Sequence, residues 1–361
     1  VQVFLNDCEV PVENLLSERG NGFKIALNIL NIGRIKLAGA TLGAAKTVIS
    51  HTVSYANERN QFGRPISKYG AIQYKMAEQA IRTFALETAT YRCGKNITNQ
   101  KEQLVAGGMD ETKALLKGVE EFAIEAAILK VFGSETLDYV VDEGVQVYGG
   151  MGYSAEAPME RAYRDSRINR IFEGTNEINR MLSVDMILKR ALKGELDLMP
   201  AVQAIAGELS SIPSMDEGGG DFAYEKQLVS NFKKAVLMTA GKAVEKLMQS
   251  LAKEQEILMN ISDMLNDVYI AESLMLRTMK LNRSGKDADG VYRSMMSVFL
   301  VDAADRINKN GRDAIASFAE GDEMNLLMMG LKRFTKYKPV NVKEERRKIA
   351  ARLIDRNAYC F

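Results

Sequence analysis

Proline is scarce in this sequence, and that scarcity restricts the possible folds more than any other feature. The chain has 6 prolines in 361 residues, whereas proteins average about 5% proline. In stretches such as 22–59 and 67–99, apolar residues recur at the spacing of one helix face. No proline interrupts either stretch. The sequence therefore predicts an all-α protein built from long helices.

The periodic stretches give the expected order of elements. Residues 1–5 alternate in polarity like a strand, so a short β segment is predicted at the N-terminus. A loop is predicted at 103–110, and a helix break between Gly133 and Glu135. Helices are predicted over 22–59, 67–99, 111–133, 135–148, 176–192, 228–251, 254–281 and 287–319.

A change in composition predicts a domain boundary at 194–220. Pro200, the residues 210–214 and three glycines at 218–220 are typical of a linker. We therefore expect two helical bundles, over 17–193 and 221–361.

Charge and residue content exclude several classes of protein. The 48 basic and 47 acidic residues give a net charge of +1, unlike a dedicated nucleic-acid-binding protein, which has a basic excess. His51 is the single histidine, so a zinc site built from several imidazoles is excluded, and no metal site is predicted. The three cysteines lie too far apart for a CxxC motif, which favours a reducing compartment. No stretch of about 18 apolar residues lacks charge, so no transmembrane helix is expected.

Three glycines lie inside the first predicted helix, at positions 33, 39 and 43. Each would cost about 1 kcal/mol relative to alanine in an exposed helix. Close packing of two helices and a cleft that admits a ligand explain these glycines equally well.

Glu173 is the residue whose surroundings best suit chemistry. It lies between Phe172 and Gly174, in a loop before Thr175, which is a good N-cap for the following helix. Glycine beside a carboxylate lets a substrate approach the backbone, so a general base is one interpretation. The other is an ordinary acidic residue near a helix N-terminus, where the helix dipole favours negative charge.

The residues around Glu173 resemble a known family. IFEGTNEINR (171–180) is similar to the signature of acyl-CoA dehydrogenases, in which the glutamate of an EGT segment is the catalytic base. Further segments resemble, in family order, a helix that meets coenzyme A, a flavin-contacting turn, and the third and fourth helices with the glycine loop after them. These segments are LNIGR (30–34), ERNQFGRPI (58–66), IEAAILKVFGSE (124–135) and EGVQVYGGMGYS (143–154).

The resemblance implies an FAD-dependent enzyme of fatty acid β-oxidation. Glu173 would remove the proton alpha to the thioester of a fatty acyl-CoA while a hydride leaves the β carbon for the flavin. A flavin ribityl hydroxyl and the base's own backbone N–H would stabilise the developing charge on the thioester oxygen. Some family members carry the base at the position of Gly33, where this chain has no carboxylate. The electrons would pass to an electron-transferring flavoprotein.

The same resemblance assigns binding residues. Three positions match residues that reach the FAD of the neighbouring subunit, namely Arg59, Gln61 and Phe62. The other positions matched to FAD contacts are Gln146, Val147, Tyr148, Gly149, Gly150, Thr175 and Glu177. Positions matched to the acyl-CoA substrate are Asn31, Arg34 and Gly174. Taken singly, such residues are also explained as a surface arginine, a helix-ending glycine pair or an N-cap threonine.

Two features resemble the very-long-chain branch of the family. GAIQ at 70–73 replaces the commoner QAIQ, and 181 residues follow Arg180. Members of this branch are homodimers with an extra C-terminal helical domain, so a long-chain acyl-CoA and a homodimer are expected. The location would be cytoplasmic in a bacterium; the alternative is the mitochondrial matrix or the inner-membrane surface.

Relative to the family, the chain lacks the N-terminal helical domain and nearly all of the middle β domain, of which 1–16 resembles the end. The flavin ring would lie between that β domain and the helical bundle. This polypeptide alone is therefore expected to bind FAD weakly or not at all and to be inactive. Two alternatives stay open: an acyl-CoA oxidase, which gives electrons to oxygen, and a non-catalytic dimerisation or assembly scaffold derived from the same fold.

A basic stretch lies near the C-terminus. Residues 331–356 contain ten Lys or Arg against three Asp or Glu, with apolar residues between them. Peripheral contact with anionic lipid, or with an acidic partner protein, is one interpretation. A solvated helix face that pairs with acidic residues elsewhere in the chain is the other.

Overall fold

The computed structural model describes residues 2–209 and 219–361, and most of these residues are helical. This confirms the predicted all-α class. The helices are α1 (Gly22–Glu58), α2 (Gly70–Ala106), α3 (Glu111–Glu121), α4 (Ala123–Tyr148), α5 (Pro158–Ser166), α6 (Asn176–Leu192), α7 (Met199–Leu209), α8 (Ala223–Leu247), α9 (Gln255–Arg283), α10 (Val291–Phe318), α11 (Gly321–Phe334) and α12 (Val342–Arg356). A hairpin of two short antiparallel strands, β1 (Asn60–Gln61) and β2 (Arg64–Pro65), follows α1.

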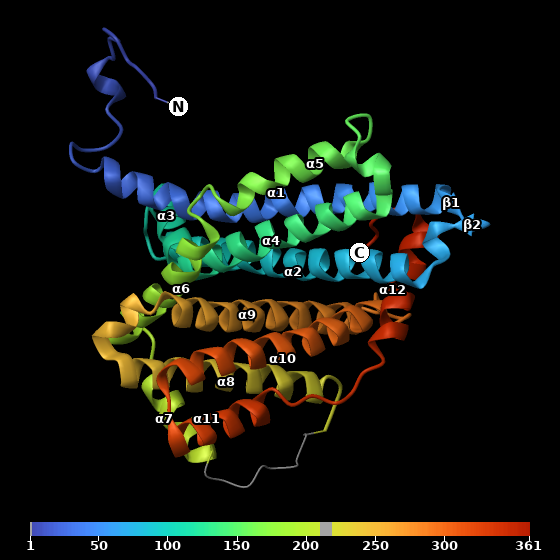
Figure 1. Cartoon of the computed structure of the whole chain (residues 1–361). Helices are drawn as coiled ribbons and strands as arrows, with labels where there is room; N and C mark the ends of the chain where they lie inside the picture. Colours follow the sequence, from blue (N-terminus) through green and yellow to red (C-terminus); the bar gives the residue numbers. More distant parts are fainter. Residues whose placement is uncertain (1, 210–218) are drawn as a thin grey trace.

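The helices form two layers (Figure 1). One contains α1, α2 and α4, with α3, α5 and α6 around them, and the other contains α8, α9 and α10, with α7 and α11. α2 packs against α9 across the boundary, and α12 returns to α2. The layers share one hydrophobic core, whose fully buried members include Met76, Leu86, Met264, Leu274 and Phe334. The second layer therefore supports the first directly.

The predicted break near Gly133 is wrong, because α4 continues through it and the break falls at Phe122. Gly133 instead allows α1 and α4 to approach closely. A Cβ added there would lie 2.7 Å from Thr41 Oγ1 and 3.3 Å from Ala38 Cα. Gly133 therefore allows α1 and α4 to pack closely and does not break the helix.

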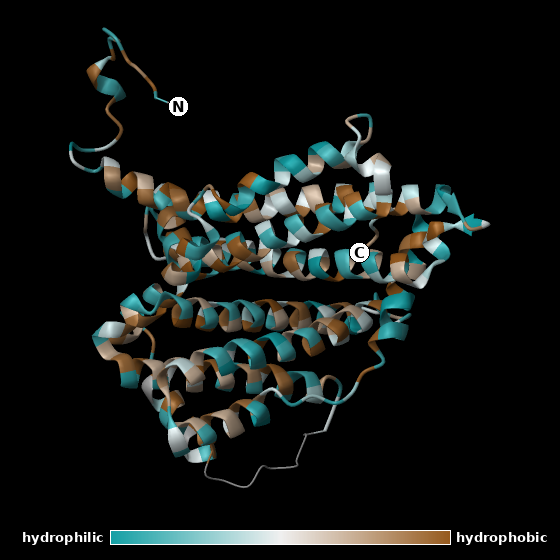
Figure 2. Ribbon diagram, viewed as in Figure 1, coloured by the Kyte–Doolittle hydropathy of each residue, from teal (hydrophilic) through white to brown (hydrophobic). Residues whose placement is uncertain are grey.

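The first residues also differ from the prediction. Residues 2–5 form no strand, and their apolar side chains are exposed. A lone alternating segment has no neighbouring strand to accept its hydrogen bonds, and pairing is what makes such a segment a strand. Apolar residues on the first turns of α1, where the helix extends beyond the bundle, are also exposed (Figure 2).

Helix α1 is long and apolar enough to cross a membrane, which the sequence inspection did not anticipate. One 18-residue window has a mean hydropathy of 1.2 and no more than two charged residues. In the structure α1 packs along α2 and α4 and buries Ala38, Ala45, Ile49 and Val53. Only 28% of that window is buried in the structure, so packing accounts for the apolar residues around Ala45, Ile49 and Val53 but not for most of the window.

Helix α7 lies inside the segment whose composition predicts a linker. It spans Met199–Leu209 and packs against α8. Pro200 is the second residue of α7, a position where a helix needs no backbone N–H donor. Residues 210–218, which carry most of the remaining linker signal, lie outside the described residues, whereas Gly219 and Gly220 lie in a bend before α8.

In the basic stretch near the C-terminus, Arg346 forms ion pairs with other helices of the same chain. This side chain lies 2.7 Å from Glu78 of α2 and 3.3 Å from Asp302 of α10. Glu78 is only 3% exposed. For Arg346, the structure therefore favours intramolecular pairing over contact with lipid. Arg347, by contrast, is half exposed, and among the described residues it pairs only within α12, with Glu344.

We expect Arg346→Ala to lower the free energy of unfolding by about 3 kcal/mol, because it leaves Glu78 buried with Arg82, 3.5 Å away, as its remaining cation. The matched control is Arg347→Ala, an exposed pair worth less than about 1 kcal/mol. Urea unfolding followed by circular dichroism measures both. Equal stabilities of the two variants would show that the buried pair does not hold α12 to the first layer.

Candidate active site

Glu173 lies in a strained turn between two helical segments, η4 (Arg167–Arg170) and α6. Its φ is +59°, and that of Gly174 is +83°. Glycine adopts such angles easily, but a residue with a side chain does so at a cost of about 1–3 kcal/mol. The surrounding contacts must hold Glu173 in this conformation. Strain of this kind is typical of functional sites.

The carboxylate of Glu173 lies directly over the backbone of Gly33 in α1. A Cβ added at Gly33 would lie 2.5 Å from Glu173 Oε2 and 2.8 Å from Oε1. Nothing lies within 4 Å of a Cβ added at Gly39 or Gly43. Gly33 therefore makes room for a side chain of the site. Neither close helix packing nor a ligand cleft explains Gly39 and Gly43.

The carboxylate group of Glu173 has no hydrogen-bond or ion-pair partner among residues 2–209 and 219–361, and no acceptor in these residues takes the Glu173 backbone N–H. Glu173 is half-buried. A carboxylate placed in this way can accept a proton from a ligand, and the N–H beside it can donate a hydrogen bond to one.

The backbone of the turn, unlike the carboxylate, is firmly held. Asn179 Nδ2 donates to the carbonyl oxygens of Glu173, Gly174 and Thr175, at 3.3, 2.8 and 3.0 Å. Arg34 Nε also donates to the Glu173 carbonyl, at 3.3 Å, and Arg34 Nη1 donates to Asn31 Oδ1 at 2.9 Å. Burial lowers the pKa of Arg34 and the Glu173 charge opposes that shift. Both predicted substrate residues on α1 thus take part in fixing the turn.

Thr175 and Glu177 complete the start of α6. Thr175 Oγ1 accepts the backbone N–H of Ile178 at 3.3 Å, which confirms the predicted N-cap. Hydrogen bonds from its own backbone N–H and from Thr175 lower the pKa of Glu177. The cap terminates the turn and fixes where α6 begins.

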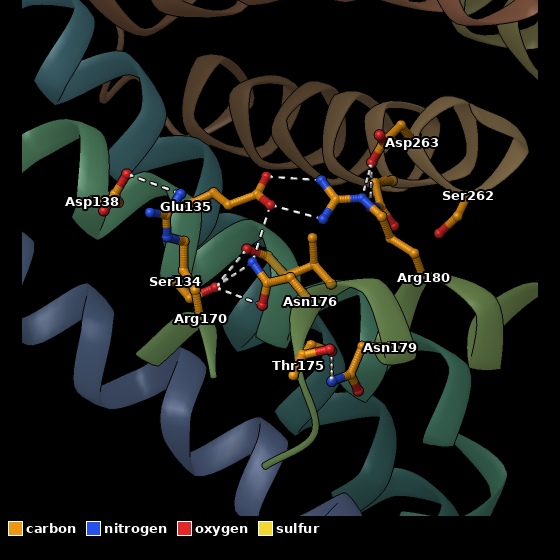
Figure 3. Close-up of polar contacts among 12 residues, drawn as sticks. Ser134, Glu135, Asp138, Arg170, Thr175, Asn176, Asn179, Arg180, Ser262 and Asp263 are labelled. Atoms are coloured by element: carbon orange, nitrogen blue, oxygen red, sulfur yellow. Dashed lines mark hydrogen bonds and ion pairs between the residues drawn. The ribbon is translucent and has the colours of Figure 1, made fainter. Parts of the chain in front are cut away.

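A buried polar network lies beneath the same turn (Figure 3). Asn176, the first residue of α6, accepts from Lys130 Nζ at 2.7 Å and donates to Ser134 Oγ and to Glu135 Oε1, each at 3.0 Å. Lys130 is fully buried. Burial lowers its pKa to about 8, although the charges of Glu177, Glu135 and Glu173 oppose the shift. Arg170 pairs with Asp138 at 3.4 Å and anchors the other side of the loop.

The remaining predicted cofactor residues lie at the other end of α1. Arg59, Gln61 and Phe62 form the exposed hairpin, and Phe62 is 92% exposed. The end of α4 lies beside the end of α1, because the rings of Tyr55 and Tyr148 stack with centroids 4.0 Å apart. Gln146 is exposed there, whereas the Val147 side chain is buried in the core, so a ligand could meet only its backbone.

The predicted residues therefore form two groups and not one. The first surrounds Glu173 and includes Arg34, and the second surrounds Arg59 and the end of α4. Arg34 and Arg59 are separated by 25 positions of one helix, which corresponds to about 37 Å. A single extended dinucleotide cannot touch both groups of the same chain.

Sequence inspection missed Lys130, Asn176 and Asn179 as parts of the site. The two asparagines lie within the segment that carries Glu173, but their side chains point to the interior, which the segment itself does not reveal. Lys130 could have been found from the sequence, because it lies within an apolar run and a lysine is rarely fully buried without a partner. Within the described part of the chain, no cluster of His, Cys, Asp and Glu is arranged to hold a metal ion.

The chain was compared with known families and proteins. Two models described as "Acyl-CoA dehydrogenase, C-terminal domain" match residues 20–188 and 231–333, which is more than half of the chain. The "Probable acyl-CoA dehydrogenase" of Bacillus subtilis (strain 168) is 41% identical over 99% of this chain and 60% of its own length. The "Very long-chain specific acyl-CoA dehydrogenase, mitochondrial" of Rattus norvegicus is 42% identical over 50% of this chain and 25% of its own length.

A solved structure agrees over nearly the whole chain. The crystal structure of an acyl-CoA dehydrogenase complexed with FAD from Bacillus anthracis matches with a TM-score of 0.95 and 41% identity. The match covers 99% of this chain and 61% of that one. This chain thus spans about three fifths of the length of the two bacillar relatives.

Proposed function

The chain belongs to the acyl-CoA dehydrogenase family, and we propose that the full-length protein is an FAD-dependent acyl-CoA dehydrogenase with Glu173 as its catalytic base. The observation that carries the proposal is the unpaired Glu173 carboxylate, which a strained and firmly held turn places over Gly33. Residues 17–193 would form the catalytic bundle and 221–361 a supporting helical domain, and the product would be an α,β-unsaturated thioester.

The residues of this chain account for the proton transfer. Glu173 takes the proton from the carbon alpha to the thioester, and its backbone N–H donates to the thioester oxygen, where negative charge develops. Arg34 and Asn179 hold the Glu173 carbonyl, so the backbone that carries the N–H and the Glu173 side chain keeps a fixed position. Preorganised donors of this kind lower the barrier because nothing has to reorient during the reaction.

The group at the end of α1 has room for a cofactor. Nothing lies within 4 Å of a Cβ added at Gly149 or Gly150, so the backbone there is open to a ligand. Arg59 and Gln61 are exposed and offer donors to a pyrophosphate or an adenine. FAD, when bound, supplies the acceptor for the hydride that leaves the β carbon.

The separation of the two groups supports a homodimer. Since they lie about 37 Å apart along α1, the second group would contact the FAD that belongs to the Glu173 group of another copy. We propose such a homodimer, with a long-chain acyl-CoA as substrate and an electron-transferring flavoprotein as electron acceptor. The similarity to the rat enzyme specific for very long chains favours this choice of substrate.

Reduction of an artificial dye by the full-length protein and palmitoyl-CoA tests the function. A dehydrogenase reduces the dye under nitrogen and forms the enoyl-CoA. Rates measured with a series of acyl-CoAs of graded length give the preferred length of the acyl group. Hydrogen peroxide formation in air without dye would instead identify an oxidase. A protein that binds FAD but converts no acyl-CoA of any length would be a scaffold, and the proposal would be wrong.

We further expect the 361-residue chain alone to lose FAD. Phe23, Leu27 and Ile29 on the first turns of α1 are 77%, 48% and 57% exposed, and exposed apolar side chains of this number indicate a surface that another part of a protein covers. Gel filtration followed at the flavin absorbance, in parallel with the full-length protein, measures retention. Flavin that stays with the 361-residue chain in a 1:1 ratio would contradict this expectation.

A further inference from the structure

Helix α6, which begins directly after the Glu173 turn, is attached to α9 of the second layer in two ways. Its C-terminal half packs through Val184 against Leu258 and Ile261 in a small apolar cluster. Next to this cluster, Ser183 and Ser262 form a buried hydrogen bond of 3.0 Å. Its N-terminal half has a charged contact instead, through Arg180.

Arg180 joins three helices. Its guanidinium binds both carboxylate oxygens of Glu135 on α4, at 2.8 and 3.0 Å, and its Nε donates to Asp263 Oδ1 on α9 at 2.6 Å (Figure 3). The side chain is 14% exposed. Burial alone would lower the pKa of Arg180, but the two carboxylates raise it above its ordinary value. The guanidinium is therefore charged at every pH at which the protein is folded.

Packing alone does not fix the position of Arg180. Arg180, Glu135 and Asp263 line a cavity of about 210 Å³ between the two layers, together with Asn266, whose Oδ1 is buried without a partner. A side chain beside a cavity of this size lacks packing contacts on the side that faces the cavity. The ion pairs with Glu135 and Asp263 thus determine where the guanidinium lies.

Glu135 connects Arg180 to the turn that carries Glu173. Its Oε1 accepts from Asn176 Nδ2 at 3.0 Å, and Asn176 is the residue one helical turn before Arg180. Asn176, Asn179 and Thr175 together fix the backbone from Glu173 to the start of α6. A continuous series of contacts therefore runs from Asp263 through Arg180 and Glu135 to the turn that carries Glu173.

Building on the proposed function, we propose that Asp263 is a positioning residue for Glu173: it holds Arg180 against Glu135 and so fixes the first turn of α6 and the direction of the Glu173 carboxylate. The second layer of helices would then contribute to proton abstraction, although it supplies no residue that touches the substrate. Asp263→Asn keeps the size of the side chain but removes the charge that holds Arg180 Nε. Arg180 can then shift relative to Glu135, while the fold and the FAD site, which has no predicted residue on α9, should survive.

The test compares Asp263→Asn with the wild type in the full-length protein. We expect the rate of flavin reduction at saturating palmitoyl-CoA to fall about tenfold, with unchanged FAD content and an unchanged KM. Asp263→Glu, which keeps the charge, should recover part of the rate. The matched control is Asp313→Asn, which removes an exposed carboxylate of α10 that pairs with Lys309 and should leave the rate unchanged.

Several outcomes would overturn the inference. A wild-type rate in Asp263→Asn would show that Asp263 does not position Glu173, as would a loss of rate that follows FAD content. If Asp263→Asn does not fold, a wild-type rate in Asp263→Glu, whose longer side chain must displace Arg180, contradicts the inference equally. If no acyl-CoA reduces the flavin of the wild-type protein, the proposed function itself is wrong. The wild-type measurement thus tests the proposed function, and the comparison with the variants tests the role of Asp263.

Discussion

Glu173→Gln should lower acyl-CoA turnover by about 10²–10⁴-fold, the contribution typical of a positioned general base. The amide has the size of the carboxylate but cannot take a proton. Neither carboxylate oxygen of Glu173 has a hydrogen-bond or ion-pair partner within the described residues, so the substitution breaks no such contact of the folded protein. Steady-state dye reduction with palmitoyl-CoA measures turnover, and thermal unfolding should give the wild-type melting temperature.

The control for this variant is Asp185→Asn, on the helix that follows the Glu173 turn. Asp185 is 50% exposed, pairs with Lys189 of the same helix and is not among the predicted site residues. This variant should therefore lose little turnover. Equal turnover in the two variants would mean that the carboxylate at 173 has no special role.

Gly33→Ala should lower turnover about 100-fold without destabilising the protein. The new Cβ would lie 2.5 Å from Glu173 Oε2, so the carboxylate has to move by several tenths of an ångström or more. A misplacement of about 1 Å in a catalytic group can cost 10²-fold in rate. The Glu173 side chain ends in a flexible carboxylate and can swing away, so the helix gains up to about 1 kcal/mol from alanine. Turnover and chemical unfolding of the same preparation measure both effects.

Gly39→Ala is the matched control on the same helix. Nothing lies within 4 Å of a Cβ at that position, so this variant should keep full turnover and gain the same helix stability. A Gly33→Ala enzyme as active as Gly39→Ala would show that the carboxylate does not depend on the space over Gly33.

The fold could largely be predicted because its long helices follow from the local sequence pattern. Helical periodicity without proline needs no tertiary information, and α1, α6 and α9 begin and end within a few residues of their predicted bounds. The errors have tertiary causes. Gly133 was interpreted as a break because glycine is a poor helix former, but the neighbouring helix α1 requires it. The alternating residues 2–5 lack a partner strand, which a sequence pattern cannot reveal.

The candidate site could be predicted only in part for a similar reason. The sequence around Glu173 identifies the carboxylate and its N-cap, since both lie in one short segment. The residues that hold the turn come from α1, α4 and α9, at Arg34, Lys130 and Asp263, far apart along the chain. The helix predicted over 22–59 already places Arg34 and Arg59 near its two ends, but only the structure shows which other residues join each group.

The most direct test of the central claim is the rate at which palmitoyl-CoA reduces the bound flavin in the full-length protein, measured by stopped flow under nitrogen. The substrate is used with either hydrogen or deuterium on its α carbon. If Glu173 removes the α proton, the wild type reduces its flavin more slowly with the deuterated substrate, and Glu173→Gln shows almost no reduction with either. Flavin reduction in Glu173→Gln at the wild-type rate would contradict the account.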